Sequence, residues 1–152
     1  MQVVYSVGES VVIKNVLVAL DASEIADRII QTLKELLLSA DSTVVLCHVF
    51  PPPESEIELP ADRPHLESPT FSYLQLEKQL QLYQDQLAFK SQVELVIGDP
   101  AEEIIRLANI HKADLIIIGS RGLTGMKRIV QGSVSSQVVE EAPCSVLVVK
   151  ST

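Results

Sequence analysis

Short apolar runs alternate along this chain with longer stretches in which apolar residues recur at helical spacing. Runs of Val, Leu and Ile that carry few charges are typical of strands buried on both faces of a parallel sheet. The pattern predicts strands at residues 14–20, 43–50, 92–97, 114–118 and 145–150.

Amphipathic helices are predicted between these strands, because apolar positions there recur every three or four residues and would bury one face. Their expected bounds are residues 23–38, 70–90, 100–112 and 133–142. Either Asp21 or Ser23 could cap the first helix. Pro100 stands at a first-turn position that tolerates proline, and Pro143 ends the last helix.

The regular alternation of strands and helices predicts an α/β fold, a single open five-stranded parallel sheet with helices on both faces. Residues 14–152 would form one domain, and residues 51–69 a surface loop rich in proline and acidic residues. Residues 1–13 could be a leader or a short extra strand. Ligands of such sheets bind beyond the carboxyl ends of the strands, where strand order reverses.

Composition and charge argue against nucleic acid and membrane partners and indicate the cellular compartment. The 152 residues carry a formal net charge of −8, which repels nucleic-acid phosphates, so we expect no nucleic acid partner. No apolar run approaches the roughly 18 residues that cross a bilayer, so we expect no membrane partner. Cys47 and Cys144 lie in apolar runs and suit a reducing compartment, which favours a cytoplasmic protein with free buried thiols.

The segment after the fourth predicted strand combines glycines, hydroxyls and positive charge. Gly119 and Gly122 would let the backbone approach a ligand, and Gly132 and Ser133 stand where the last helix begins. No Asp or Glu occurs from residue 115 to residue 139, and Arg121 adds positive charge. These features favour a phosphate site, although the glycines could also serve only as a turn-forming connection.

Other phosphate-binding and catalytic patterns are missing from the sequence. Neither G-x-x-x-x-G-K-[ST] nor G-x-G-x-x-G after the first strand occurs. The histidines His48, His65 and His111 show no metal-ligand spacing and no Ser-His-acid pattern. We therefore expect neither a catalytic residue nor a metal held by the protein itself.

The spacing G-x2-G-x9-G-[ST], met by Gly119, Gly122, Gly132 and Ser133, resembles the nucleotide signature of the ATP-binding branch of the universal stress protein family. The segments VLVALDASE, LCHV, ADLIIIGSRG and CSVLVVK are similar to the rest of that family's pattern, and the resemblance covers the chain from residue 14 onward. The family often has Gly where this chain has Ala22, and Pro where it has Ala19.

The resemblance implies a Rossmann-like fold of the adenine nucleotide alpha hydrolase type, with sheet order 3-2-1-4-5. It also implies a site for ATP, ADP or AMP, to which the phosphates could carry Mg²⁺. Asp21 would contact the adenine or ribose end, Ala19 would line the base pocket, and Val49 would offer its backbone to the adenine edge. From the residues alone, Asp21 could equally cap a helix, and Val49 could be a core residue. The expected phosphate and ribose cradle consists of Gly119, Gly122, Gly132, Ser133, Val134 and Ser135.

Three functions remain open at this point. The first is a nucleotide-binding switch in a stress response, with slow or no hydrolysis, since no carboxylate is placed near the phosphates. The others are a weak ATPase or phosphotransferase and a nucleotide-free dimeric interaction protein. The resemblance also implies a homodimer in which the strand from Val146 to Val149 pairs with its copy, unless a loop or the leader covers that edge.

Overall fold

The computed structural model describes residues 13–21, 23–36, 38–52, 69–120 and 133–150. Most of the predicted leader (1–13) and of the predicted proline-rich loop (51–69) lies outside the described residues. So does the stretch 121–132 of the glycine segment.

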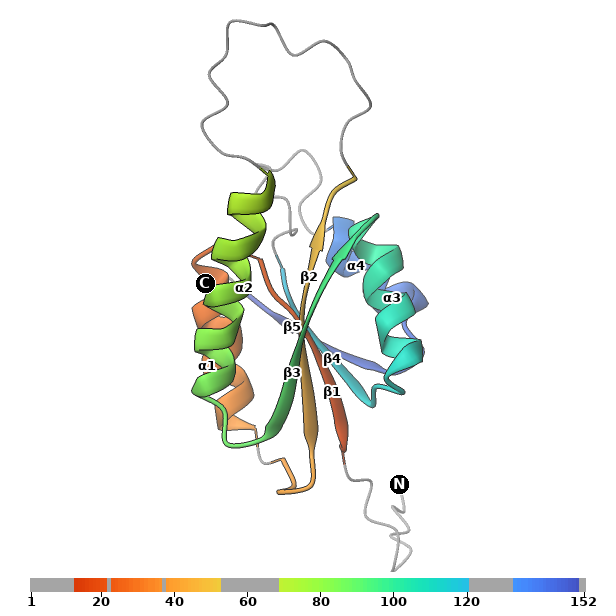
Figure 1. The fold of residues 1–152 in the computed structure, drawn as a ribbon. Helices are drawn as coiled ribbons and strands as arrows, with labels where there is room; N and C mark the ends of the chain where they lie inside the picture. The colour runs from red at the N-terminus through yellow and green to blue at the C-terminus, as the bar shows by residue number, and fades with distance from the viewer. Residues whose placement is uncertain (1–12, 22, 37, 53–68, 121–132, 151–152) are drawn as a thin grey trace, which may run out of the picture.

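Five parallel strands form one sheet in the order β3-β2-β1-β4-β5, which confirms the predicted fold class and strand order. The first strand is central because its apolar residues are buried on both faces. The sheet appears in Figure 1 as a twisted stack of arrows. The strands are β1 (Asn15–Ala19), β2 (Thr43–Phe50), β3 (Lys90–Ile97), β4 (Leu115–Gly119) and β5 (Ser145–Val149).

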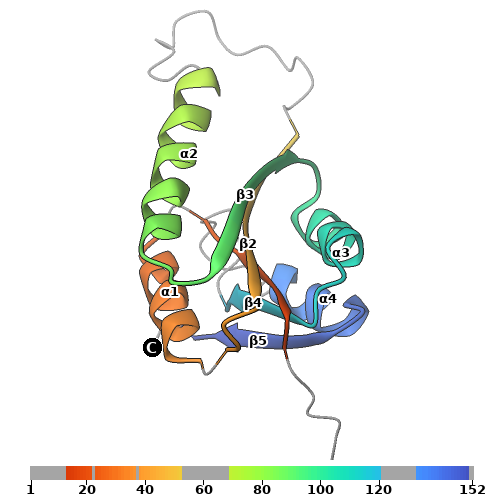
Figure 2. The same ribbon diagram turned by 60° about the horizontal axis from the view of Figure 1, so that its bottom comes forward.

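Helices cover both faces of the sheet, with α1 and α2 on one face and α3 and α4 on the other (Figures 1 and 2). The third helix begins as its sequence predicts, because the Asp99 side chain accepts from the Glu102 amide at 3.0 Å and Pro100 follows directly. The helices are α1 (Ile25–Glu35), α2 (Pro69–Asp85), α3 (Pro100–Ile110) and α4 (Ser133–Glu141).

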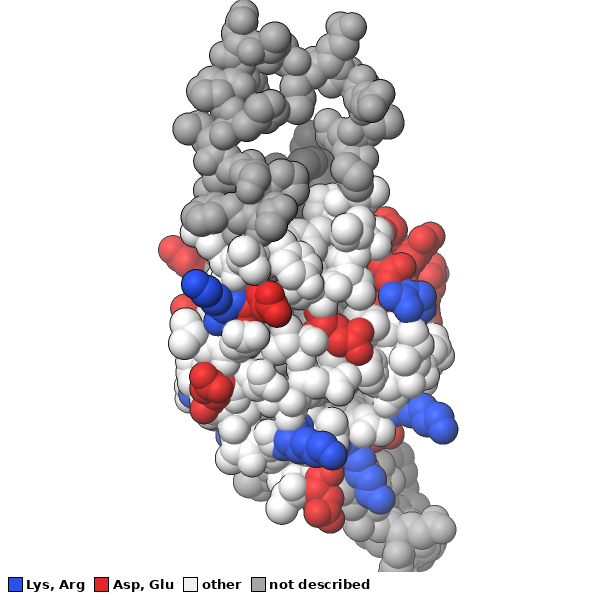
Figure 3. All heavy atoms as spheres, viewed as in Figure 1, with Lys and Arg blue, Asp and Glu red and all other residues white. Residues whose placement is uncertain are grey.

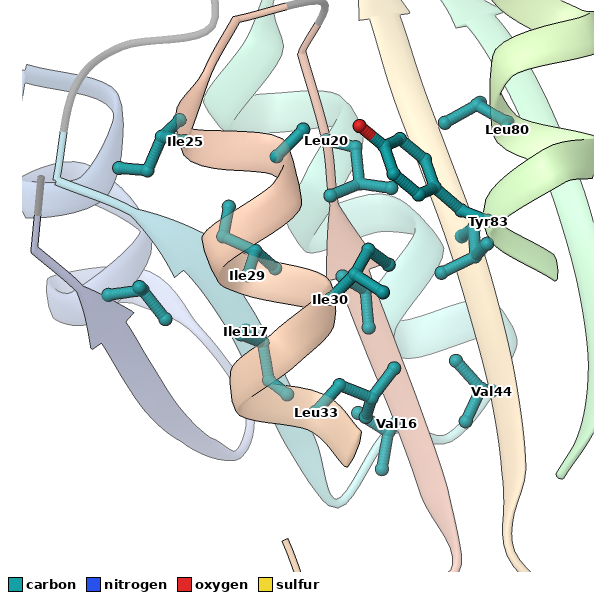
Figure 4. Packing of buried hydrophobic residues seen from close by; sticks show 14 of the residues in the cluster. Val16, Leu20, Ile25, Ile29, Ile30, Leu33, Val44, Leu80, Tyr83 and Ile117 are labelled. Atoms are coloured by element: carbon teal, nitrogen blue, oxygen red, sulfur yellow. The ribbon is translucent and has the colours of Figure 1, made fainter. Parts of the chain in front are cut away.

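Each face of the sheet has its own hydrophobic core. Along β1, Val16 and Val18 pack toward α1 and α2, whereas Leu17 and Ala19 pack toward α3 and α4. Figure 4 shows the first core, in which Leu33 of α1 lies fully buried beside β1. Truncating such a leucine to alanine costs about 2–5 kcal/mol, so these cores dominate stability.

Several element boundaries differ from the sequence prediction. The first helix ends at Glu35 rather than residue 38, because Leu36 takes an extended conformation. The third strand begins at Lys90, where the second helix was expected to continue, because Lys90 pairs with Thr43 in the β2–β3 ladder. The α2 helix itself already ends at Asp85.

Both cysteines are free thiols, as predicted, but only Cys47 is buried, whereas Cys144 is half-buried. Cys47 lies in β2 and Cys144 directly precedes β5, so two other strands separate them in the sheet. At about 4.8 Å per strand step, the separation is on the order of 14 Å, beyond the reach of a disulfide. None of the helices in the described part of the chain is both long and apolar enough to cross a membrane.

Candidate functional site

The carboxyl ends of the two neighbouring central strands bring Ala19 and Val49 onto one face of the sheet. Ala19 is paired with Cys47 in the β1–β2 register, and Val49 lies two residues further along β2, so both point the same way. Each is 1% exposed and belongs to the core on the α3 and α4 side. Ala19, predicted to line the base pocket, and Val49, predicted to offer its backbone to the adenine edge, therefore lie together.

The carboxylate of Asp21, two residues beyond the end of β1, is buried and 6% exposed. Its Oδ1 accepts from the Ser23 amide at 2.9 Å and also from the Ser23 hydroxyl. The first helix begins later, with Glu24 at its N-cap and no side-chain capping bond. The predicted cap by Asp21 or Ser23 is therefore wrong, because each is the other's hydrogen-bond partner.

Gly119 is the last residue of β4. The side chain of Ile25 fills the space beside its Cα, on the sheet face that α1 covers. A Cβ built on Gly119 would lie 2.9 Å from Cδ1 of Ile25 in α1, so the glycine permits close packing of that helix. The Ser120 amide still donates to Val149 at 2.8 Å, which keeps the chain in the sheet just beyond Gly119. Any ligand contact by Gly119 would thus use its backbone.

The last helix, α4, begins on the same sheet face as Ala19 and Val49. Ser133 is exposed at its first position, Val134 is half-buried against that core, and Ser135 is buried. A helix N-terminus presents free amide groups and a positive dipole end to anions. Three predicted site residues, Arg121, Gly122 and Gly132, lie outside the described residues.

His48 is a residue of this region to which the sequence interpretation gave no role. It lies in β2 between Cys47 and Val49, is 8% exposed, and places Nδ1 2.7 Å from the carbonyl oxygen of Leu20. Burial lowers the pKa of this imidazole, and the Leu20 carbonyl and nearby Asp21 oppose that effect only in part. The sequence signal was a polar residue inside an otherwise apolar buried strand.

The opposite end of the sheet holds a second polar group. His111, which caps the C-terminus of α3, places Nε2 2.5 Å from Oε1 of Glu94. A small hollow of about 50 Å³ beside it has room for little more than water. Among the described residues, no group of three or more His, Cys, Asp or Glu side chains could hold a metal ion.

Charged side chains are interspersed on the described surface that faces the viewer in Figure 3. Lys and Arg residues lie close to Asp and Glu residues there, with uncharged surface between them. Over this face the charges form neither a continuous basic stripe nor a continuous acidic one, so it offers no concentrated field to a charged ligand.

Comparison with known sequences gives the family. The model of the universal stress protein family matches residues 13–150. The universal stress protein MJ0531 of Methanocaldococcus jannaschii is 42% identical over 73 residues, 48% of this chain and 43% of that protein. That match spans less than half of the relative's length. Sll1388 of Synechocystis is 30% identical over 151 residues, covering 89% of this chain and 96% of that protein.

Solved structures give the same fold. The structure of MJ0577 of Methanocaldococcus jannaschii is similar, with a TM-score of 0.73, 30% identity, and 93% and 99% of the two chains covered. A universal stress protein in complex with cAMP has a TM-score of 0.66 and 20% identity, covering 93% and 99%. The Arabidopsis thaliana protein At3g01520 with AMP bound has a TM-score of 0.61 and 22% identity, covering 91% and 92%. The extent of the family match and the shared fold agree: this chain belongs to the universal stress protein family.

Proposed function

We propose that this chain binds an adenine nucleotide, with ATP as the first candidate and ADP or AMP next, and acts as a regulatory switch in a stress response. One observation carries the proposal: Ala19 and Val49 share one sheet face at the strand ends, beside buried Asp21 and the start of α4. The cAMP and AMP bound in two proteins of the same fold support an adenine nucleotide as the ligand class.

The proposed contacts divide between the two ends of the ligand. Ala19 lines the base pocket, the Val49 backbone meets the adenine edge, and Asp21 contacts the adenine or ribose. The glycine segment and the start of α4 bind the phosphate and ribose end, because their amide groups and hydroxyls can donate hydrogen bonds to anionic oxygens. Those residues are Gly119, Arg121, Gly122, Gly132, Ser133, Val134 and Ser135. A Mg²⁺ ion would come with the phosphates.

Slow or absent hydrolysis is part of the proposal. Phosphoryl transfer needs a group that positions the attacking water and ligands for the metal. The sequence has no Asp or Glu between residues 115 and 139, next to the proposed phosphate end. Asp21, the acid placed at the proposed base end, is already hydrogen-bonded to Ser23. Binding without efficient turnover fits a ligand that shifts a conformational equilibrium.

A homodimer through β5 completes the proposal. This strand lies at the edge of the sheet, and Val146, Leu147 and Val148 are only half-buried within one chain. An apolar edge strand invites pairing with another strand, and a second copy of β5 in antiparallel orientation is the simplest partner. Nucleotide bound near the start of α4 could then influence the dimer, because α4 packs beside β5.

The test begins with the purified protein. Denaturation and chromatography of the released small molecules would identify any nucleotide that copurifies. Calorimetric titration of the stripped protein with ATP, AMP and cAMP follows, together with the variants Asp21→Asn and Gly132→Val. We expect binding in the micromolar range or tighter, weakened at least about tenfold in both variants, which is about 1.4 kcal/mol.

Asp41→Asn is the matched control, because Asp41 is an exposed carboxylate just before the amino end of β2. Its affinity should equal that of the wild type. If the wild type releases no nucleotide and binds none below millimolar concentration, the proposed function is wrong. The position of β5 at the edge of the described sheet would then favour the second candidate, a nucleotide-free dimeric interaction protein.

A further inference from the structure

The β1–β2 ladder lacks one backbone hydrogen bond that the parallel register would allow at its carboxyl end. In a parallel ladder, one residue donates to and accepts from the two residues that flank its partner. At the start of the ladder Thr43 donates to Lys14 at 2.7 Å, and near its end Leu20 donates to Cys47 at 2.8 Å. The next bond in this series would run from the Val49 amide to the Leu20 carbonyl.

That bond is not among the backbone hydrogen bonds of the described residues, and a side chain takes its place. Nδ1 of His48 lies 2.7 Å from the Leu20 carbonyl oxygen. A carbonyl can only accept, so Nδ1 carries the proton and donates it. The Leu20 carbonyl is thus satisfied by His48, and the Val49 amide is left without its ladder partner.

Packing contacts fix the position of the His48 imidazole beside the Leu20 carbonyl. His48 is buried, and its ring packs edge-on against Phe50 with centroids 4.7 Å apart. Phe50 in turn stacks on Tyr73 of α2 at 5.7 Å. Alternation along β2 puts His48 on the α1 and α2 side, opposite Val49. The histidine therefore acts on the proposed nucleotide face only through the backbone.

We propose that His48 is a positioning residue of the nucleotide site. Its hydrogen bond to the Leu20 carbonyl keeps the Val49 amide available to an acceptor nitrogen of the adenine ring. The same bond fixes the chain that leads into Asp21. This inference rests on the proposed function. Without the histidine donor, the Leu20 carbonyl would pair with the Val49 amide, and the ladder would close over the position that the base needs.

Three variants separate this role from a general structural one. His48→Leu removes the donor at similar volume, and His48→Asn keeps an N–H donor at the same distance from the backbone. His111→Leu is the control, because it removes another hydrogen-bonded histidine at the far end of the sheet. Each is titrated with adenosine, AMP and inorganic triphosphate, and its melting temperature is measured.

We expect His48→Leu to lose about tenfold in affinity for adenosine and AMP, with unchanged affinity for inorganic triphosphate and little change in melting temperature. His48→Asn should stay within about threefold of the wild type, and His111→Leu should equal it. Equal losses for adenosine and triphosphate, or full adenosine affinity in His48→Leu, would overturn the inference.

Amide hydrogen exchange supplies a readout that needs no ligand. In the free wild type, the Val49 amide should exchange at least about tenfold faster than the Val45 amide, which donates within the same ladder, and His48→Leu should remove that difference. Equal protection of both amides in the wild type would overturn the inference even if His48→Leu fails to fold. Failure of the wild type to bind any nucleotide would instead refute the proposed function, while this exchange pattern would still test the role of His48 in the ladder.

Discussion

The phenol of Tyr83 donates a hydrogen bond to the carboxylate of Asp27 at 2.7 Å and so ties α2 to α1 over their shared sheet face. The tyrosine is 7% exposed and lies in the core beside Leu80 (Figure 4). Burial and the bond to Asp27 raise the pKa of Tyr83 to about 12. Both effects favour the neutral phenol in the folded state.

Removing this hydroxyl should weaken the fold modestly. We expect Tyr83→Phe to lower the free energy of unfolding by about 1 kcal/mol, the usual contribution of one hydrogen bond, since the ring and its packing remain. Urea denaturation at neutral pH measures the change. Tyr73→Phe is the control, because Tyr73 is 42% exposed. Equal effects of the two substitutions would contradict an inter-helix role for the Tyr83 hydroxyl.

The same tyrosine predicts a loss of stability at alkaline pH. Its pKa in the folded chain lies above the value of 10.0 for an unperturbed tyrosine, so the folded state retains the proton more strongly than the unfolded one. The stabilisation is complete below pH 10 and is lost as the pH rises through about 12. Between those values the wild type should lose more stability than Tyr83→Phe, as followed by urea denaturation at each pH. Parallel pH profiles for the two proteins would argue against this linkage.

Gly119 offers a test of packing between β4 and α1. In Gly119→Ala, the new methyl group would press on Cδ1 of Ile25, and overpacking of this kind costs about 1 kcal/mol or more. Ile25→Val removes that carbon and by itself costs about 1 kcal/mol. The double variant should therefore be more stable than the sum of the two losses predicts, as measured by denaturant unfolding. Strictly additive losses would mean that the two positions do not contact each other.

The sequence predicted four of the strands well because each is a compact apolar run, and it predicted the start of β3 and the helix ends less well. Leu36 and Leu38 prolong the helical pattern of α1, yet they lie in extended or irregular chain after Glu35 and still pack against the same core. The spacing of apolar residues indicates which side chains are buried, but a leucine can be buried from a helix or from extended chain. The pattern therefore does not fix where the helix ends. The start of β3 at Lys90 was missed because pairing with β2, not hydrophobicity, defines it.

The sequence allowed the three residues proposed for the base end to be placed near one another, whereas it gave no role to His48. Ala19 and Val49 lie near the carboxyl ends of apolar strands and Asp21 follows one, so the parallel sheet itself brings them to one edge. His48 differs, because its partner is a backbone carbonyl 28 residues earlier in the chain. A sequence pattern cannot state which carbonyl a buried histidine meets, since that depends on where the ladder of two strands stops.

The two thiols should differ in reactivity. Burial, helped by Glu94, raises the pKa of Cys47 to about 12, and burial with Asp114 raises that of the half-buried Cys144. Because the thiolate is the reactive form, iodoacetamide at pH 8 should label Cys144 slowly in the folded protein and Cys47 only after denaturation. Peptide mass spectrometry distinguishes the two sites, and folded Cys144→Ala should remain unlabelled. Rapid labelling of Cys47 in the native protein would contradict its burial.

The position of β5 at the edge of the described sheet allows the proposed dimer to be tested without disturbing the single chain. The Ser120 amide donates to the Val149 carbonyl, and Gly119 pairs with Val149 in the parallel register. Val149 therefore directs its backbone groups toward β4, and alternation turns those of Val148 toward the open edge. Proline at residue 148 would remove only an outward amide, which edge strands tolerate.

We accordingly expect Val148→Pro to be a folded monomer and the wild type a dimer in sedimentation equilibrium. Val148→Thr, which keeps both the amide and the branched shape, should remain a dimer, so that loss of apolar contact alone is not the cause. A dimeric Val148→Pro variant would show that the chains associate elsewhere than along β5. A monomeric wild type would mean that this edge is left open or covered within the chain, and bound nucleotide could then signal only through surfaces of a single chain.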